Sequence, residues 1–467
     1  FPSKFKKVIF YIGALFGIKN FGIYKSFGTS KFFYPKIDEE IEKKVKGFYK
    51  NFRKKIKDRK AILNLKIDGI YIGDLLYDTY LKSKRTLQPT IDLDSDEFNI
   101  FLRDFLRLHF YWVNYFNVND VEAIIGSHSV YTIGLPLRIA ASKNIKALVV
   151  GENYLMKVTN QNLHWANETK NFKKIFDSLS KKNKSKYLRF SKLKFIERFG
   201  GKSSVRDMPY MTSSPYKKNK IKLKLKKTKK KRILIMPHDF IDATHVYGKN
   251  IFPDFYQWII FLAKLSFETQ NQYEWFVKLH PKRKTSWAMY SDYNENVLRN
   301  ILKKQKNSIK IIDSNTSHFE VLNNNFDFIL TVFGTVATEY AYFNKYVINA
   351  SINNPHNSFN FSLSPKNISE YKKLILNLKK INFKINKKEI LKYFFMRNYY
   401  TNRNCFFEDY GEMLKKVGYH EQWTYKMYSY WVENFNIESF EKNSKYLENF
   451  IQKKDNFFSI KHKPFNF

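Results

Sequence analysis

The chain has 467 residues and a mass of 56.1 kDa, about three times the size of a common domain, so we expect two or more domains. Its 43% hydrophobic and 18% aromatic residues exclude a disordered or collagen-like chain. Lys and Arg number 83 against 42 Asp and Glu, so the formal net charge is +41 and the chain attracts polyanions. Because Lys, Asn, Ile, Phe and Tyr have A/T-rich codons, genome bias with solvated lysines is an equally good interpretation of this charge. The single cysteine, Cys405, excludes an internal disulfide and a thiolate metal cluster and fits a cytosolic protein.

The first predicted region, residues 1–60, is basic and helical. Its apolar run at residues 8–18 is shorter than the roughly 20 residues that a membrane-spanning helix needs. The run also resembles the apolar part of a signal peptide, but no small-residue cleavage site follows it. We therefore interpret it as a buried or interfacial segment.

Residues 61–216 have the pattern of a first α/β domain. Apolar runs at residues 61–67, 122–128 and 145–152 predict buried strands, each followed by polar turns or helical segments. Strands that alternate with helices at this spacing indicate a parallel α/β fold.

A strongly basic stretch, residues 217–232, separates this domain from the next and holds eleven Lys or Arg in sixteen positions. A solvated interdomain linker is the favoured interpretation, and a patch for anionic lipid or a polyanionic substrate is the alternative.

Residues 233–365 form the second predicted α/β domain, and residues 366–467 a helical, aromatic-rich C-terminal region. The expected strands of the second domain are 233–236, 275–279, 309–312, 328–332 and 346–348, and its expected helices are 254–265, 319–323 and 336–343. This series is Rossmann-like. Two such domains facing each other direct the carboxyl ends of their strands toward one ligand site.

A strand-turn-helix segment, FGTVATEYAYF at 333–343, is the first candidate site. Gly334 and Thr335 form the turn, and the helix N-terminus that follows favours an anion. Thr335 can cap the helix and offer its hydroxyl to a phosphate, and Glu339, on the same face, can accept bonds from a ribose. An ordinary Thr-capped helix is the alternative.

The segment VKLHP, residues 277–281, is the second candidate. Lys278 and His280 lie at the end of a predicted strand, which Pro281 terminates, so both cationic groups could meet a phosphate there. The alternative is a histidine that only bonds a neighbouring backbone group.

The loop PHDFIDATHVYG, residues 237–248, is the third candidate. Its His238, Asp239, Asp242 and His245 lack the spacing of a zinc or hydrolytic metal motif. We therefore expect these groups, His238 and His245 in particular, to hold a sugar nucleotide and expect no metal site.

The first domain offers three candidates for a general base. Asp74 and Asp78 are four residues apart on one helical face and could supply a base, but a solvated acidic face or a first-turn partner of the helix dipole is the favoured interpretation. His128 follows a buried strand, and Glu152 follows another. We rank Asp74 first, then His128, then Glu152.

The segments HDF, KLHP and GTVATEY, in this order and followed by the strand YVINA, resemble the nucleotide-binding half of GT-B glycosyltransferases of bacterial surface polysaccharides. The resemblance is strongest to capsule transferases of the Kdo-transferase type. Bacterial sialyltransferases and CDP-glycerol glycerophosphotransferases share the His-Pro signature more distantly. The similarity spans about residues 230–360 and implies that His280, Pro281, Gly334 and Thr335 bind nucleotide and phosphate, with Glu339 toward the ribose. Many family members have Ser in place of Thr335, which keeps the hydroxyl.

The resemblance implies an α/β, GT-B-like fold of two facing Rossmann-like domains with helical additions at both ends. It implies a metal-independent enzyme, without cofactor, that transfers a sugar from a CMP- or UDP-linked donor to a polysaccharide or glycolipid acceptor. A base of the first domain would deprotonate the acceptor hydroxyl, while Lys278, His280 and the helix N-terminus would stabilise the departing phosphate. The expected location is cytoplasmic and peripheral, at the inner face of the membrane, where anionic lipids attract lysine.

Three alternatives stay open. A glycerophosphotransferase or a sugar-nucleotide epimerase on the same fold would differ in its product. A non-enzymatic polyanion-binding protein would use the positive charge, but the basic residues are scattered and no nucleic-acid motif is recognised, so no nucleic-acid partner is expected. An inactive scaffold would tolerate loss of His280 and Glu339.

Overall fold

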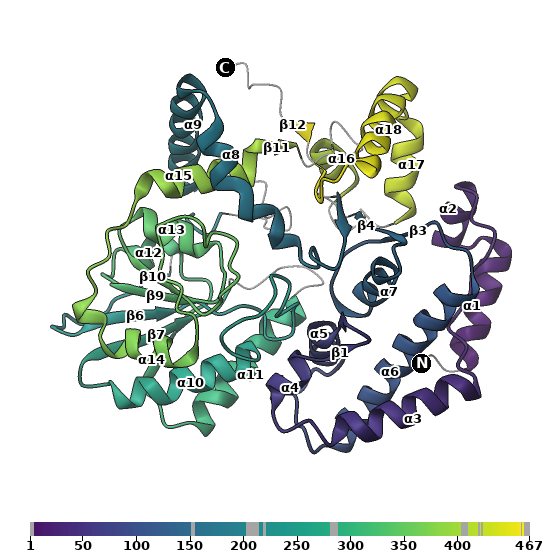
Figure 1. Cartoon of the computed structure of the whole chain (residues 1–467). Coiled ribbons are helices and arrows are strands. Elements are labelled where there is room, and N and C mark those ends of the chain that lie inside the picture. The colour runs from purple at the N-terminus through teal and green to yellow at the C-terminus, as the bar shows by residue number, and fades with distance from the viewer. Residues whose placement is uncertain are drawn as a thin grey trace.

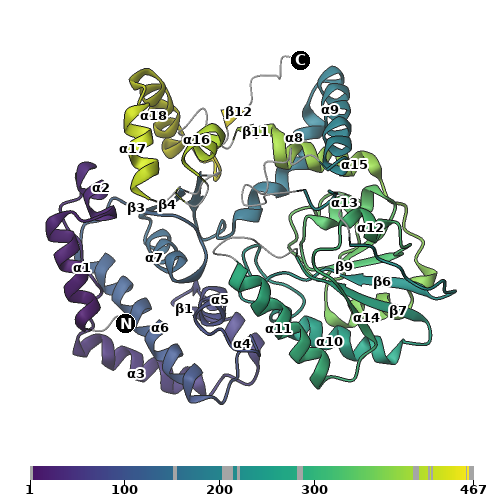
Figure 2. The ribbon, with the colours of Figure 1, turned by 180° about the vertical axis from the view of Figure 1, so that it is seen from behind.

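The computed structural model describes residues 4–150, 155–201, 214–217, 221–280, 288–402, 410–418, 421, 424–458 and 460–461. Two α/β units lie side by side, the N-terminal unit in purple and blue and the C-terminal unit in teal and green (Figure 1). The view from behind shows α5 of the first unit and α11 of the second beside the boundary between them (Figure 2).

The N-terminal unit is built on a three-stranded sheet of order β3-β4-β5, in which β3 and β4 are parallel and β5 is antiparallel. Its elements in chain order are α1 (Lys4–Phe16), α2 (Asn20–Ser26), α3 (Glu39–Arg53), α4 (Arg59–Leu63), β1 (Lys66–Ile67), β2 (Ile70–Tyr71), α5 (Gly73–Ser83), α6 (Asp96–Val118), β3 (Ala123–Gly126), α7 (Tyr131–Ser142), β4 (Lys146–Val150) and β5 (Leu155–Val158).

The C-terminal unit is built on a parallel five-stranded sheet with helices on both faces. Its elements are η1 (Trp165–Asn171), α8 (Phe172–Ser178), α9 (Lys181–Phe199), β6 (Lys231–Ile235), α10 (Phe255–Glu268), β7 (Tyr273–Lys278), α11 (Ala288–Lys304), β8 (Ile309–Ile312), α12 (His318–Leu322), β9 (Phe328–Thr331), α13 (Val336–Tyr342), β10 (Tyr346–Asn349), α14 (Ile368–Leu376), η2 (Leu378–Lys380) and α15 (Lys387–Phe395).

The C-terminal segment returns to the N-terminal unit, where Phe450 packs on Leu148 and Leu155. Its elements are η3 (Met396–Tyr400), β11 (Thr401–Asn402), α16 (Tyr410–Val417), α17 (Tyr425–Glu433), α18 (Ile437–Gln452) and β12 (Ile460–Lys461). Figure 1 shows α17 and α18 on the same side of the molecule as α1 and α2.

The spatial order of the large sheet is β10-β9-β6-β7-β8. If the strands are numbered along the chain from β6 and read from the β8 edge, this is the order 3-2-1-4-5 of a nucleotide-binding doubly wound sheet. All five strands predicted for the second domain are present, so the Rossmann-like prediction is confirmed. Buried apolar runs explain them, since every residue of β9 and all but the first of β6 are buried.

The prediction of a strand at residues 61–67 is wrong. Asp58 accepts a hydrogen bond from the backbone N–H of Ala61 at 2.8 Å and caps the short helix α4. The chain then forms the two-residue strands β1 and β2, joined by Asp68 and Gly69 with positive φ angles of 49° and 80°. An Asp-Gly turn of this kind favours a tight hairpin over a long strand.

Helices α8 and α9 lie within the predicted first domain, 61–216, but pack on the second unit. Phe172, Phe190 and Phe195 share a buried cluster with Met236 of the C-terminal unit. Their amphipathic pattern indicates a buried face but not which sheet covers it. Similarly, the predicted linker 217–232 ends in β6, where Arg232 is buried and bonds Glu274 at 3.0 Å.

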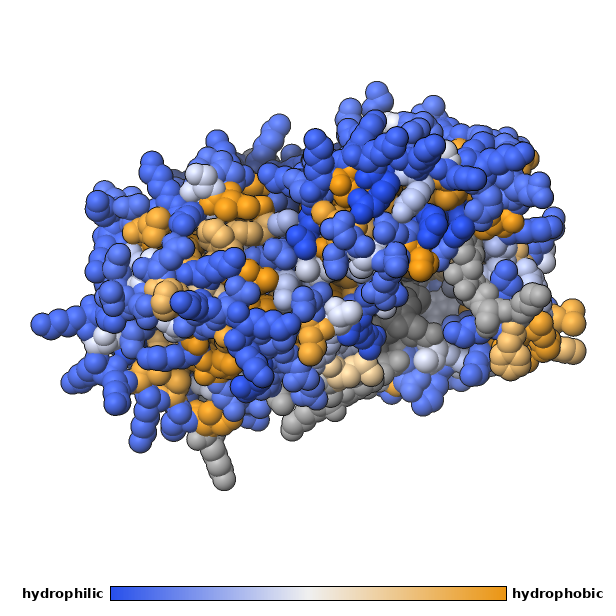
Figure 3. Space-filling view, turned by 90° about the horizontal axis from the view of Figure 1, so that it is seen from below, coloured by the Kyte–Doolittle hydropathy of each residue, from blue (hydrophilic) through white to orange (hydrophobic). Residues whose placement is uncertain are grey.

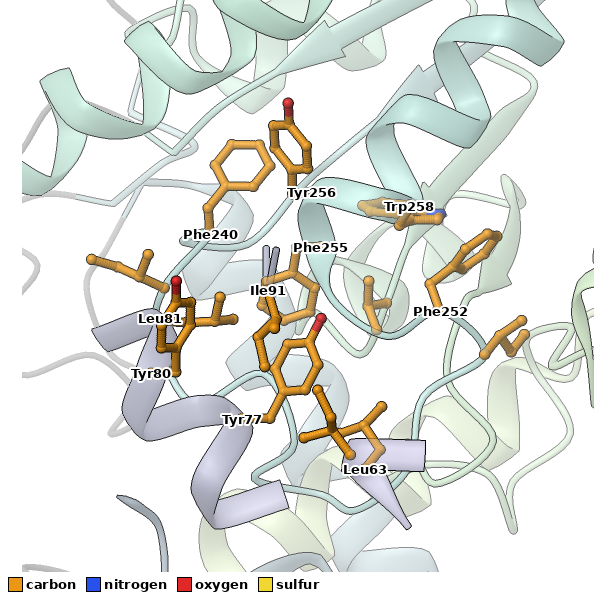
Figure 4. Packing of buried hydrophobic residues seen from close by; sticks show 14 of the residues in the cluster. Leu63, Tyr77, Tyr80, Leu81, Ile91, Phe240, Phe252, Phe255, Tyr256 and Trp258 are labelled. Atoms are coloured by element: carbon orange, nitrogen blue, oxygen red, sulfur yellow. The ribbon is translucent and has the colours of Figure 1, made fainter. Parts of the chain in front are cut away.

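The two units share one hydrophobic core. Tyr77, Leu81 and Ile91 of the first unit pack in one cluster with Phe240 and Phe255 of the second (Figure 4). Tyr77 Oη also donates a 2.5 Å hydrogen bond to Asp254, the residue that caps α10. The junction between the units is therefore built from apolar packing and buried hydrogen bonds.

Candidate functional site

The large sheet has a topological switch point between β6 and β9. From β6 the chain runs outward through β7 to β8, then returns to β9 on the other side of β6. Because the two connections leave in opposite directions, open sheets of this kind bind ligands beside the carboxyl ends of these two strands. His238 follows β6, and the segment 333–335 follows β9.

His238 packs against two aromatic rings at this point, and those rings also contact each other with centroids 5.8 Å apart. Its ring stacks on Phe255 with a 5.0 Å centroid separation and lies 4.4 Å from the ring of Phe333. The backbone N–H of Phe333 donates to Nε2 of His238 at 3.3 Å, so the ring proton is on Nδ1 in the neutral form. Burial, reinforced by the charge of His280, lowers the pKa of His238 to about 3. His238 is thus a neutral imidazole.

Gly334 and Thr335 turn the chain tightly against His238. A Cβ atom at Gly334 would lie 2.8 Å from Oγ1 of Thr331 and 3.5 Å from Cε1 of His238. Thr335 is half-buried and precedes α13, as predicted, but its side chain makes no capping hydrogen bond to that helix. The capping role predicted for Thr335 is therefore wrong, and its hydroxyl is not used by the helix.

The two cations at the end of β7 differ in exposure. Lys278 is 1% exposed, and its Nζ donates to the carbonyl oxygen of Ser314 at 2.9 Å. Burial lowers the pKa of Lys278 to about 8. The prediction that Lys278 could meet a phosphate at the end of β7 is therefore wrong, because its ammonium group instead bonds the loop after β8. His280 is exposed and lies near enough to His238 to affect its protonation.

Asp242, in the loop after β6, bridges to the N-terminal unit. Its Oδ1 accepts hydrogen bonds from Lys82 Nζ at 3.1 Å and Tyr131 Oη at 2.9 Å. Tyr131 Oη also accepts from the backbone N–H of Ala243 at 2.8 Å. The carboxyl end of β6 therefore faces α5 and α7 of the other unit.

His128 lies on the N-terminal side of the same junction. It follows β3 and is half-buried, and its ring meets Tyr131 edge-on with centroids 5.9 Å apart. Burial lowers the pKa of His128, while the nearby charge of Asp242 raises it by less. The charge of Asp242 raises the pKa of both His128 and His238 by less than burial lowers them, so this carboxylate lies near a histidine of each unit.

His245 is turned away from this group and is buried against α5. Its Nδ1 lies 2.7 Å from Oδ1 of Asp78, and its backbone N–H donates to the other Asp78 oxygen at 3.0 Å. Burial favours a neutral ring, but contact with Asp78 outweighs it and raises the pKa of His245. This pair fastens the loop to the N-terminal unit, so His245 does not lie with His238 at the switch point, and its position does not support the sugar-nucleotide role predicted for it.

Asp74 is also buried, and Arg138 occupies its carboxylate. The guanidinium donates to the two oxygens at 2.6 and 2.8 Å. Burial opposes ionisation, but Arg138 outweighs it and lowers the pKa of Asp74. A carboxylate held ionised in a bidentate ion pair is a weak general base, so the role of Asp74 in this structure is to hold Arg138 in position. Asp74 is therefore neither an accessible base nor part of a solvated face, but it does lie in the first turn of α5, where the helix dipole favours a negative charge.

Glu339 lies inside the C-terminal unit with both oxygens engaged. Oε1 accepts from Arg198 Nε at 2.7 Å, and Oε2 accepts from Tyr216 Oη at 2.8 Å. The side chain joins α9 to α13 and is 5% exposed. In this structure Glu339 holds two helices together, and its carboxylate is not presented to a ribose.

Two predicted residues, Glu152 and Pro281, lie outside the described residues. Within the described part of the chain, no group of three or more His, Cys, Asp or Glu has the arrangement of a metal site. In the same part, every helix is too short or too polar to cross a bilayer.

The structure thus brings together five predicted or nearby residues at the switch point, which we call the switch-point site: His238, His280, Phe333, Gly334 and Thr335. His128 of the other unit lies near Asp242, in the loop that also carries His238. Sequence reasoning missed Tyr131 and Lys82. Both contact Asp242, which is 111 residues from Tyr131 and 160 from Lys82 in sequence, so no local spacing indicated them.

No protein-family model matches the chain, and no curated protein matches its sequence. Among solved structures, the chain is similar to KpsC of Thermosulfurimonas dismutans, a beta Kdo 2,4 transferase, with 13% identity and a TM-score of 0.35 over 58% of this chain and 78% of that one. It is also similar to the UDP-GlcNAc 2-epimerase of Methanocaldococcus jannaschii, with 13% identity and a TM-score of 0.25 over 62% and 79%.

The fold assignment depends on the topology of this chain. Two α/β units meet with the carboxyl ends of β3 and β6 directed toward one junction, and the second unit has the 3-2-1-4-5 order. The architecture is GT-B-like. The predicted α/β fold class is confirmed, but the N-terminal unit differs from the parallel, Rossmann-like domain predicted for it, because its sheet has three strands and β5 pairs antiparallel with β4. The helical addition α16 to α18 packs on this N-terminal unit.

Proposed function

We propose that this protein is a glycosyltransferase that moves a sugar from a nucleotide-activated donor to a polysaccharide or glycolipid acceptor. One observation carries the proposal: the switch-point site holds a neutral His238, packed against Phe255 and Phe333 and near the exposed His280, in a loop whose Asp242 also lies near His128 of the other unit. Such switch points bind nucleotides in doubly wound folds. The resemblance of the HDF, KLHP and GTVATEY segments supports the same class of donor.

In this proposal the C-terminal unit holds the donor. The Nδ1–H of His238 and the hydroxyl of Thr335 donate hydrogen bonds to the phosphate oxygens, and Phe333 forms an apolar side of the site. His280 supplies positive charge in its protonated form and stabilises the nucleotide phosphate as it leaves. A CMP-linked acidic sugar is favoured slightly over a UDP-linked sugar. Because these groups carry the charge, no metal ion is required.

His128 is the proposed general base. Its lowered pKa keeps the imidazole neutral, which is the form that accepts a proton from the acceptor hydroxyl. Asp242 lies close enough to stabilise the imidazolium that forms, and Lys82 and Tyr131 hold Asp242 in place. Bond formation at the anomeric carbon then accompanies departure of the nucleotide phosphate.

The proposal predicts that His128→Gln lowers transfer by about 10²- to 10⁴-fold, because the variant keeps the size of the side chain but loses the base. Nucleotide release from CMP- and UDP-linked sugars, with mass analysis of the product, measures this. Binding of the free nucleotide should remain within about twofold of the wild-type value, since His128 does not contact the phosphate in this proposal.

Ser127→Ala is the matched control, because Ser127 is the exposed neighbour of His128. It should retain wild-type turnover. Full turnover by His128→Gln would contradict the role of His128. If the free nucleotide sugar is changed and no acceptor product forms, the protein is an epimerase and not a transferase. A phosphodiester product would indicate a glycerophosphotransferase.

A further inference from the structure

Helix α1 exposes its large apolar side chains to solvent instead of burying them. Phe5 is 73% exposed, Leu15 70% and Phe16 73%, and the residues between them on the same face are also exposed. The members of this surface, which we call the α1 face, are Phe5, Val8, Ile9, Ile12, Leu15 and Phe16. The residues 5, 9, 12 and 16 follow the helical repeat, so they form one continuous stripe.

The opposite side of α1 packs through small residues. Gly13 and Ala14 are buried, and a Cβ atom at Gly13 would lie 2.9 Å from the ring of Phe21 in α2. The helix therefore sits close to α2 with its small side and turns its large apolar side outward. This is the reverse of the usual pattern, in which the large apolar side chains face the core. The buried alternative for residues 8–18 is thus wrong.

Helix α2, on which α1 packs, is itself held by contacts with α17. Ser26 Oγ of α2 and Tyr428 Oη of α17 are 2.8 Å apart, and Phe27 lies 5.8 Å from the ring of Trp431. Helix α2 is therefore held in place by a segment about 400 residues away in the chain. In Figure 3, an orange group protrudes from a largely blue surface at the edge on the side where α1 lies in Figure 1.

The charge around the α1 face indicates what covers it. Residues 1–37 contain seven lysines and no Asp, Glu or Arg. Lys19, Lys25 and Lys31 are exposed, and Lys25 Nζ donates to the carbonyl oxygen of Leu15 at 2.8 Å, so a lysine sits at the end of the apolar stripe. An apolar stripe bordered by lysines matches the acyl region and the anionic headgroups of a lipid bilayer.

We propose that α1 binds an anionic membrane surface by inserting the α1 face into the bilayer, with the lysines at the headgroups. A second copy of the chain fits less well, because it would place like-charged, lysine-rich segments against one another in a protein of net charge +41. The inference does not depend on the proposed transferase reaction, because lipid binding needs neither nucleotide nor sugar.

Co-sedimentation of the full chain with vesicles tests this inference. Wild type should bind vesicles of phosphatidylcholine mixed with phosphatidylglycerol and bind pure phosphatidylcholine vesicles much less. The double variant Ile12→Ser, Phe16→Ser should lower the partition coefficient about 30-fold or more, because two side chains no longer enter the apolar layer. Lys19→Gln should lower it about fivefold on the anionic vesicles only.

The control is Phe267→Ser, which removes a 43% exposed aromatic from α10 of the other unit and should bind like wild type. If the double variant unfolds, Phe5→Ser with Ile9→Ser replaces it. Absence of wild-type binding to anionic vesicles, or equal loss in the control, would overturn the inference. Self-association in sedimentation that the double variant abolishes, without vesicle binding, would identify a second copy as the occupant.

Discussion

The pKa of each buried histidine in this protein depends on the charged groups beside it. Contact with Asp78 outweighs burial and raises the pKa of His245, whereas burial without a carboxylate lowers the pKa of His109 to about 4 and that of His356 to about 3. His238 is an intermediate case: Asp242 raises its pKa, but burial and the charge of His280 outweigh this, so it serves the proposed donor site as a neutral hydrogen-bond donor.

His109 gives a prediction about pH. It is fully buried in α6, and neither ring nitrogen has a hydrogen-bond partner among the described residues. Because its pKa is lowered from about 6.5 to about 4, its contribution to stability is complete above about pH 6.5 and is lost as the pH falls toward 4. The variant His109→Leu should not lose stability in this way, because leucine does not bind a proton.

Chemical denaturation at two pH values measures the effect. Between about pH 7.5 and pH 5, the wild-type free energy of unfolding should fall by about 2 kcal/mol more than that of His109→Leu. Equal pH dependence in the two proteins would mean that His109 is not buried in the neutral form.

At the scale of the element, the turn between β9 and α13 is the part of the site most sensitive to added volume. Gly334→Ala would place a Cβ 2.8 Å from Oγ1 of Thr331, whose oxygen also accepts from the Gly334 backbone N–H at 3.3 Å. Displacing this contact should cost about 1–3 kcal/mol of stability and weaken nucleotide binding.

Gly47→Ala is the control for this substitution. Gly47 lies inside α3 with no atom within 4 Å of the added Cβ, so alanine should raise the free energy of unfolding by about 0.5–1 kcal/mol. Thermal and chemical unfolding of both variants measure the difference. A Gly334→Ala protein as stable as Gly47→Ala, with unchanged nucleotide affinity, would contradict the close packing around His238.

The strands of the C-terminal unit and its helices α10, α12 and α13 were predictable because each follows from a local pattern, whereas α11 and the packing of α8 and α9 on this unit were not predicted. The strands are short buried runs, and α10 and α12 begin at the side-chain caps Asp254 and Ser317. The prediction failed at residues 61–67, where the Asp58 cap and the Asp-Gly turn compete with the apolar pattern. A cap and a turn are local signals, and they outweigh hydrophobicity in a segment this short.

The site residues were harder to predict because burial and pairing are not local. Strand ends placed His238, His280, Gly334 and Thr335 at the switch point. The partners of Asp74 and Glu339, in contrast, are Arg138 and Arg198, which are 64 and 141 residues away in sequence. No spacing in the sequence indicates that these carboxylates are already paired.

At the scale of the whole molecule, the two units are held in contact by elements of both. Helix α5 contributes Tyr77 to Asp254, Asp78 to His245 and Lys82 to Asp242. Two of these partners lie in the loop after β6, which also carries His238. The packing that joins the units therefore fixes the position of the switch-point site relative to His128.

Nucleotide binding at the switch-point site can be measured with a thermal-shift panel of CMP, CDP, UMP, UDP and GDP on wild type and His280→Ala. A ligand at 100 times its dissociation constant should stabilise the fold by about 2.7 kcal/mol. We expect a shift by nucleotides of one base, CMP and CDP first, that His280→Ala reduces strongly and Phe267→Ser retains. No shift with any nucleotide, or an equal shift in His280→Ala, would show that nucleotides do not bind at this site.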